Sequence, residues 1–176
     1  MRAPALSSSP APQLSGSVRM GKALPPCVRV GTAGWSYADW KGTVYPAKGG
    51  RDFEPLPYLA SRIRLIEVDS TFYRIPEPAR SAEWARKVSD HPDFRFSLKL
   101  FQGFTHTRKA SLVDERAFHR VVEPLARYGR LSALLVQWPW SFKHTPENRK
   151  VLCDLLSRFS AYPLAVELRH ATWARE

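Results

Sequence analysis

Cysteine is scarce in this chain: Cys27 and Cys153 are the only two among 176 residues, and no C-x-x-C pair is present. This scarcity argues against a zinc site built on paired cysteines and against a disulfide framework. The composition therefore favours a reducing compartment, and we expect a cytoplasmic protein.

Several other signals are absent as well. No apolar stretch approaches the roughly 18 residues needed to span a bilayer, so no membrane association is expected. The sequence contains no P-loop, no Rossmann glycine fingerprint and no Ser-His-Asp signature, and Lys48-Gly49-Gly50 indicates only a turn. Motif-based nucleotide binding and serine hydrolase chemistry are therefore not indicated.

Acidic residues are outnumbered. The chain has 16 Asp and Glu against 27 Lys and Arg, which gives a net charge of +11. Such a balance permits attraction to an anionic small molecule or to nucleic acid. The alternative is a solvated arginine-rich surface, because the basic residues form no dense run.

Two regions differ in composition. Residues 1–26 are rich in Pro, Ser and Ala without periodicity, and we predict a disordered N-terminal extension. Residues 27–176 alternate short apolar strands with helical patterns, which predicts parallel strands joined by crossover helices. The strands are expected at 28–31, 65–68, 94–98, 131–136 and 164–168. The helices are expected at 56–62, from about 81, at 114–128, and after Thr145 as N-cap.

Charged residues alternate with apolar ones along three of these strands. Because side chains of a strand alternate between its two faces, Glu67 and Asp69 share one face of the second strand. The same holds for Arg95 and Lys99 in the third strand, and the fifth strand places Glu167 and Arg169 together. Buried charges of this density are costly unless they are paired. We therefore predict a closed β/α barrel with these charges inside, near its mouth.

Six stretches resemble the YecE-like family, domain of unknown function 72. They are VGTAGWSYADWKGTVYP, EVDSTFYRIP, the lysine after FRFSL, FTH, LLVQWPWSF and VELRHATW. The resemblance runs from Val28 to the end of the chain and implies a TIM-type (β/α) barrel, but it supplies no reaction. Only about five of the eight strand-helix units of such a barrel are recognisable, so the barrel is expected to be incomplete in this chain.

The sequence departs from the family pattern at four positions. Ala33 stands where serine is frequent, and Asp69 where asparagine is frequent. Trp138 and Trp140 replace residues that are commonly leucine and proline. Asp69 adds a negative charge to the expected mouth of the barrel.

Functional residues of β/α barrels gather at the C-terminal ends of the strands. The expected catalytic residues are Glu67, Asp69, Lys99, Glu167 and His170. The expected substrate-binding residues are Trp35, Ser36, Thr71, Tyr73, His106, Gln137, Arg169 and Trp173. Acids, cations and aromatic faces together suit a phosphorylated sugar or a nucleic-acid phosphodiester.

The chemistry of this set has two alternatives. Glu67 and Glu167 could act as general acid and base of a hydrolase or isomerase, with His106 as a second proton carrier. Alternatively, Glu67, Asp69, Glu167 and His170 could share a divalent metal. The identity of any cofactor is left open, and Lys99 and Arg169 would bind the anion in either case.

Three plainer interpretations stand beside this one. The acids could form internal salt bridges only, and the loop residue His106 could simply be solvated. The protein could be a non-catalytic nucleic-acid-binding module, as its charge permits. Finally, a chain with five strand-helix units could be an inactive truncated fragment.

Overall fold

The computed structural model describes residues 28–174. Its centre is one sheet of five parallel strands. The strands are β1 (Gly31–Ala33), β2 (Leu65–Val68), β3 (Arg95–Lys99), β4 (Leu131–Trp138) and β5 (Leu164–Leu168). They lie in the order β1-β2-β3-β4-β5, so each strand pairs with its neighbour in sequence. The prediction for residues 1–26 lies outside the described residues.

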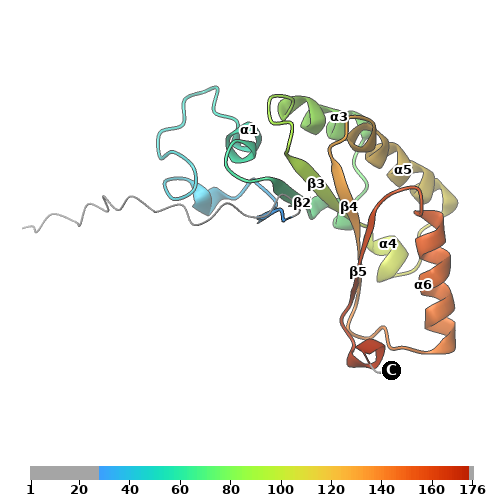
Figure 1. Cartoon of the computed structure of the whole chain (residues 1–176). Helices are drawn as coiled ribbons and strands as arrows, with labels where there is room; N and C mark the ends of the chain where they lie inside the picture. The colour runs from blue at the N-terminus through green and yellow to red at the C-terminus, as the bar shows by residue number, and fades with distance from the viewer. Residues whose placement is uncertain (1–27, 175–176) are drawn as a thin grey trace, which may run out of the picture.

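The sheet is open rather than closed. Within residues 28–174, β1 pairs only with β2, and β5 pairs only with β4. The five strands expected from the sequence are therefore confirmed, but these residues form no closed barrel, because five strands do not bring the two edges together. The expected alternation of strands and helices is confirmed (Figure 1).

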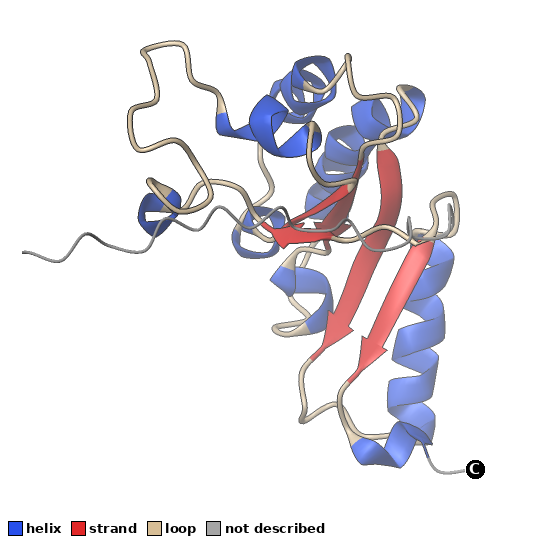
Figure 2. Ribbon diagram, turned by 60° about the vertical axis from the view of Figure 1, so that its left-hand side comes forward, coloured by secondary structure: helices blue, strands red, loops and turns tan. Residues whose placement is uncertain are grey.

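The main helices lie on one side of the sheet (Figures 1 and 2). They are α1 (Pro55–Ala60), α3 (Pro78–Lys87), α5 (Leu112–Arg127) and α6 (Pro146–Arg158). The sequence analysis did not foresee the short helices α2 (Ser70–Tyr73) and α4 (Gln102–Thr105), or the 3-10 turns η1 (Ala38–Trp40) and η2 (Ala171–Ala174). Strand β1 also begins three residues later than expected, at Gly31.

The hydrophobic core lies between the sheet and these helices. Ile66, Phe96 and Leu134 point into it from neighbouring strands and are fully buried, and helix α5 adds Phe118 and Val122. Their spacing of two in strands and three or four in the helix explains why one face of each element is buried. The predicted alternation of apolar and charged faces is thereby confirmed for β2 and β3.

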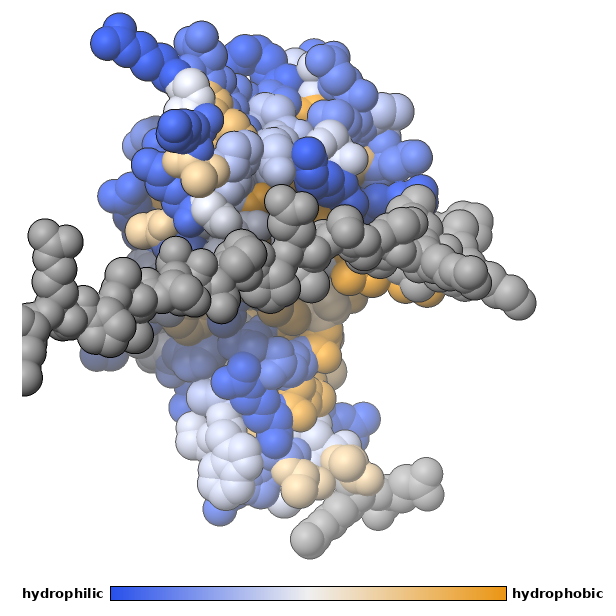
Figure 3. Space-filling model, turned by 90° about the vertical axis from the view of Figure 1, so that its left-hand side faces the viewer, coloured by the Kyte–Doolittle hydropathy of each residue, from blue (hydrophilic) through white to orange (hydrophobic). Residues whose placement is uncertain are grey.

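Strand β5 departs from this pattern. Val166, which was expected on a covered apolar face, is 41% exposed. It pairs with the buried Val136, so the exposure arises from its place on the edge strand. A view of one side of the molecule shows hydrophobic residues in separate patches on a mainly hydrophilic surface (Figure 3).

Helix α5 begins with a capping box at Ser111. The Ser111 hydroxyl accepts a hydrogen bond from the Asp114 N–H at 3.2 Å, and the Asp114 carboxylate accepts from the Ser111 N–H at 2.7 Å. We expect Ser111→Ala to lower the free energy of unfolding by about 1 kcal/mol, because one N-terminal N–H loses its partner. Urea denaturation measures this loss. The control is Ser89→Ala, whose hydroxyl makes only a 3.4 Å contact with Asp90; equal losses in both variants would contradict the capping role.

Candidate functional site

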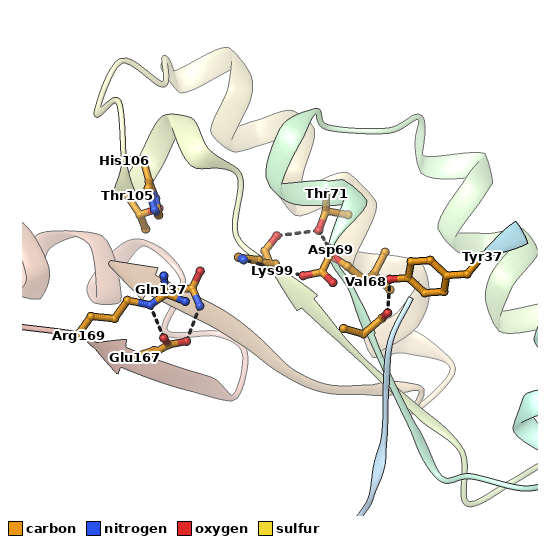
Figure 4. Close-up of polar contacts among 11 residues, drawn as sticks. Tyr37, Val68, Asp69, Thr71, Lys99, Thr105, His106, Gln137, Glu167 and Arg169 are labelled. Carbon is orange, nitrogen blue, oxygen red and sulfur yellow. Dashed lines mark hydrogen bonds and ion pairs between the residues drawn. The ribbon is translucent and has the colours of Figure 1, made fainter. Parts of the chain in front are cut away.

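Polar side chains from four strands gather on one face of the sheet, opposite the hydrophobic core, near the C-terminal ends of the strands. Strand pairing places Glu67 beside Ser97, Lys99 beside Leu135, and Gln137 beside Glu167. Because paired residues of neighbouring strands point to the same face, these side chains face one side of the sheet. Figure 4 shows Asp69 and Lys99 together at the ends of β2 and β3, and Gln137, Glu167 and Arg169 together at the ends of β4 and β5.

The first group contains Glu67, Asp69 and Lys99. Burial is the main cause that raises the pKa of Glu67, the neighbouring carboxyl group of Asp69 raises it further, and Lys99 acts against this shift. The Lys99 Nζ lies 3.9 Å from Asp69 Oδ1. Glu67 and Asp69 therefore share one face beside one cation, and this environment favours the neutral form of Glu67.

The second group is centred on Glu167. The amide Nε2 of Gln137 donates to one carboxylate oxygen at 2.5 Å, and Nε of Arg169 donates to the other at 2.5 Å. These hydrogen bonds, with the charges of Arg169 and Lys99, lower the pKa of Glu167. The negative charge of Glu167 contributes to the raised pKa of Glu67, whereas the pKa of Glu167 itself is lowered.

His106 directly follows helix α4, and one cation of each group, Lys99 and Arg169, acts on its charge. Burial, together with the positive charges of Lys99 and Arg169, lowers its pKa. Its ring lies edge-on to Phe72, with centroids 4.8 Å apart, and its Nδ1 is 2.9 Å from the Thr105 hydroxyl. At neutral pH the ring is therefore uncharged and able to exchange a proton.

Thr71 has a positioning role. Its side chain is fully buried, and its hydroxyl lies 2.8 Å from the Val68 carbonyl oxygen and 2.7 Å from the Lys99 carbonyl oxygen. These contacts join the end of β2 to the end of β3 (Figure 4). Thr71 was expected to bind substrate, but its hydroxyl is committed to the protein backbone and instead fixes the position of Lys99.

His170 and Trp173 point elsewhere. The His170 ring lies 4.7 Å from Trp140, and its Nδ1 accepts a hydrogen bond from the Thr172 N–H at 3.1 Å. Trp173 donates its indole N–H to the Phe142 carbonyl at 2.7 Å and stacks on the Phe142 ring. Both residues therefore support the segments after β4 and β5. Over residues 28–174, no three His, Cys, Asp or Glu side chains are placed to hold a metal, so the four ligands expected from the sequence do not form a set.

The three remaining expected residues, Trp35, Ser36 and Tyr73, lie on the β1 and β2 side of the site. Trp35 packs edge-on against Trp84 at 5.6 Å and belongs partly to the core. Tyr73 is 70% exposed, so its ring is accessible to a ligand. Ser36 lines a pocket.

This pocket has a volume of about 380 Å³ and lies beside Asp69. It is lined by Gly34, Trp35, Ser36, Tyr37, Val68, Asp69, Ser70, Arg74, Pro76, Arg80 and Trp84. The sequence analysis missed Arg74 and Arg80. The sequence does place both arginines beside the prolines between α2 and α3. They were missed because the prediction considered only residues at the ends of strands.

Comparison with known proteins identifies the family. Residues 29–176 match the family described as protein of unknown function DUF72. The chain belongs to this family. A curated relative of this DUF72 chain, UPF0759 protein YunF of Bacillus subtilis strain 168, is 29% identical over 153 residues, which cover 83% of this chain and 52% of the relative.

Solved structures agree with this assignment. A DUF72 family protein from Thermotoga maritima MSB8 is 35% identical, with a TM-score of 0.66 over 84% of this chain and 58% of its own. A DUF72 family protein from Enterococcus faecalis V583 is 28% identical, with a TM-score of 0.69 over 84% of this chain and 52% of its own. The chain thus spans about half the length of these relatives. Among the residues that the structure describes, no helix is long and apolar enough to cross a membrane.

Proposed function

We propose that this DUF72 chain carries an acid/base site of a TIM-barrel-type enzyme, a hydrolase or isomerase, with Glu67 as proton donor and Glu167 as proton acceptor. The observation that carries the proposal is the opposite shift of the two pKa values within one site. Environments that push the pKa values of two neighbouring carboxyl groups apart are how enzymes assign acid and base roles. The five parallel units in sequence order would form one arc of the barrel.

A phosphorylated sugar or a nucleic-acid-type substrate fits this site best. Lys99 and Arg169 supply positive charge on either side of the acids, and a neutral His106 faces both. The exposed ring of Tyr73 offers a surface on which a sugar or a base could stack. No step of this proposal requires a metal.

Loss of either carboxyl group should reduce turnover. We expect Glu67→Gln and Glu167→Gln each to lower kcat by about 10²–10⁴-fold, the range of general acid/base catalysis. The measurement screens phosphorylated sugars and short oligonucleotides and then compares variants on the substrate that reacts. Glu123→Gln, on the exposed surface of α5, is the matched control. Full activity in both site variants would overturn the proposal.

Stability should also depend on Glu67 and pH. Because the folded-state pKa of Glu67 is raised, its protonated form favours folding below the unfolded-state pKa, and this contribution is lost as pH rises through the folded-state value. A glutamine side chain does not titrate, so Glu67→Gln should gain in melting temperature over the natural protein as pH increases from about 4 to about 8. A difference that stays constant across this range would show that Glu67 is not held protonated.

Nucleic-acid binding without catalysis is the second candidate, and the net charge of +11 favours it. Binding by phosphate contacts weakens steeply with salt. Under this alternative, Glu67→Gln would leave oligonucleotide binding unchanged or make it tighter, whereas a loss of binding in Glu67→Gln would count against it.

A further inference from the structure

The pocket beside Asp69 differs in character from the acid/base site of Glu67 and Glu167. Its wall carries two guanidinium groups, from Arg74 and Arg80, and two hydroxyl groups, from Ser36 and Ser70. Neither arginine side chain forms an ion pair or hydrogen bond with any part of residues 28–174. Two cations on one concave wall therefore have no carboxylate from the described protein to neutralise them.

The backbone adds further donors to the same wall. Gly34 adopts a positive φ of 77°, which turns the chain at the end of β1 beside the pocket that it lines. The N–H groups of Trp35 and Ser36, which follow it, donate to no acceptor within residues 28–174. Consecutive N–H groups after such a turn form a concavity that suits an anion.

One acid lines the pocket, and its charge is already engaged. The Oδ1 atom of Asp69 lies 3.9 Å from the Nζ atom of Lys99. The remaining polar groups are donors or hydroxyls, and Trp35, Pro76 and Trp84 supply apolar walls. A volume of about 380 Å³ exceeds what one inorganic anion needs and falls in the range of small-molecule sites.

We propose that this pocket binds the phosphate group of a small phosphomonoester, with Arg74 and Arg80 as its charge partners. Arginine matches phosphate because its planar group donates two parallel hydrogen bonds. The apolar walls would then contact the organic part of the ligand. The inference does not depend on the acid/base role of Glu67 and Glu167, since it concerns different cations and its test measures binding alone.

The test titrates the full chain with inorganic phosphate and with glucose 6-phosphate at constant ionic strength, by calorimetry. We expect both to bind, and the double variant Arg74→Gln/Arg80→Gln to weaken both by at least about tenfold, as loss of bidentate charge-assisted hydrogen bonds implies. The control variant Arg116→Gln removes one exposed cation from α5, away from the pocket, and should leave the affinities unchanged. Circular dichroism spectra of the variants verify that they fold.

Four results would overturn the proposal. The first is unchanged affinity in the double variant, and the second is equal weakening in Arg116→Gln. The third is loss of phosphate binding in Lys99→Gln with full binding in the double variant, which would show that the anion binds at Lys99 and not in the pocket. A single-stranded oligonucleotide is titrated in parallel; if it binds more tightly than glucose 6-phosphate and loses affinity in the double variant, the pocket takes a phosphodiester backbone instead of a small phosphomonoester.

Discussion

Replacing Phe96 by alanine is expected to lower the free energy of unfolding by about 3–5 kcal/mol. Phe96 lies in β3, the central strand, and its side chain is fully buried. Its ring meets Phe94 edge-on, with centroids 5.0 Å apart, and also contacts Trp84 and Trp35. Truncation loses the transfer free energy of the ring and leaves a cavity among three other aromatic rings, which cannot collapse around it easily.

Thermal and urea denaturation measure this effect. For a chain of this length, about 1 kcal/mol corresponds to roughly 2–4 °C, so the melting temperature should fall by about 6–20 °C. Trp140→Ala is the control, because the Trp140 side chain is 67% exposed and should cost little. A loss below about 1 kcal/mol in Phe96→Ala, within the range of surface substitutions, would contradict the position of Phe96 in the core.

Gly31→Ala should have the second largest effect. A Cβ atom built on Gly31 would lie 1.6 Å from the carbonyl oxygen of Leu65, its partner in β2. Because the obstacle is backbone, β1 must move away from β2, and we expect a cost of about 3 kcal/mol, at the upper end of overpacking effects. The Gly34 turn follows directly after β1, so phosphate binding in the pocket should weaken as well.

Gly50→Ala provides a matched comparison for this prediction. A Cβ atom at Gly50 would meet nothing within 4 Å, and its φ is not positive. The substitution should therefore be neutral or stabilise the protein by up to about 1 kcal/mol through the unfolded state. Equal melting temperatures for the two alanine variants would show that β1 does not approach β2 as closely as described.

Much of the fold follows from periodicity in the sequence. The alternation in β2 and β3 predicted which side chains are buried, because strands have a strict period of two, whereas the alternation in the edge strand β5 did not. Helix α6 begins as expected, since the Thr145 hydroxyl accepts from the Asn148 N–H. The five strands were also predicted, whereas closure could not be, because it is a property of the whole sheet and no local pattern encodes it.

The site was predictable only along the strands. Glu67 and Asp69 lie two residues apart at the end of β2, so they share one face of the sheet. The register of β2 against β3 places Lys99 on the same face. Trp35 and His170 lie in turns after the strands, where the turn geometry decides which way a side chain points. Trp35 packs against Trp84 and His170 against Trp140, so neither joins the acids. Thr71 could not be assigned in advance either, since its role depends on the unforeseen helix α2 and on a carbonyl 28 residues away.

The outer edge of β5 has a consequence for handling the protein. Over residues 28–174, no strand pairs with that edge, and the apolar Val166 is exposed next to it. Such an edge is a template for adding a strand from another molecule. The apparent molecular mass from light scattering should therefore rise with protein concentration, and Val166→Lys should reduce this rise without disturbing the pocket beside Asp69.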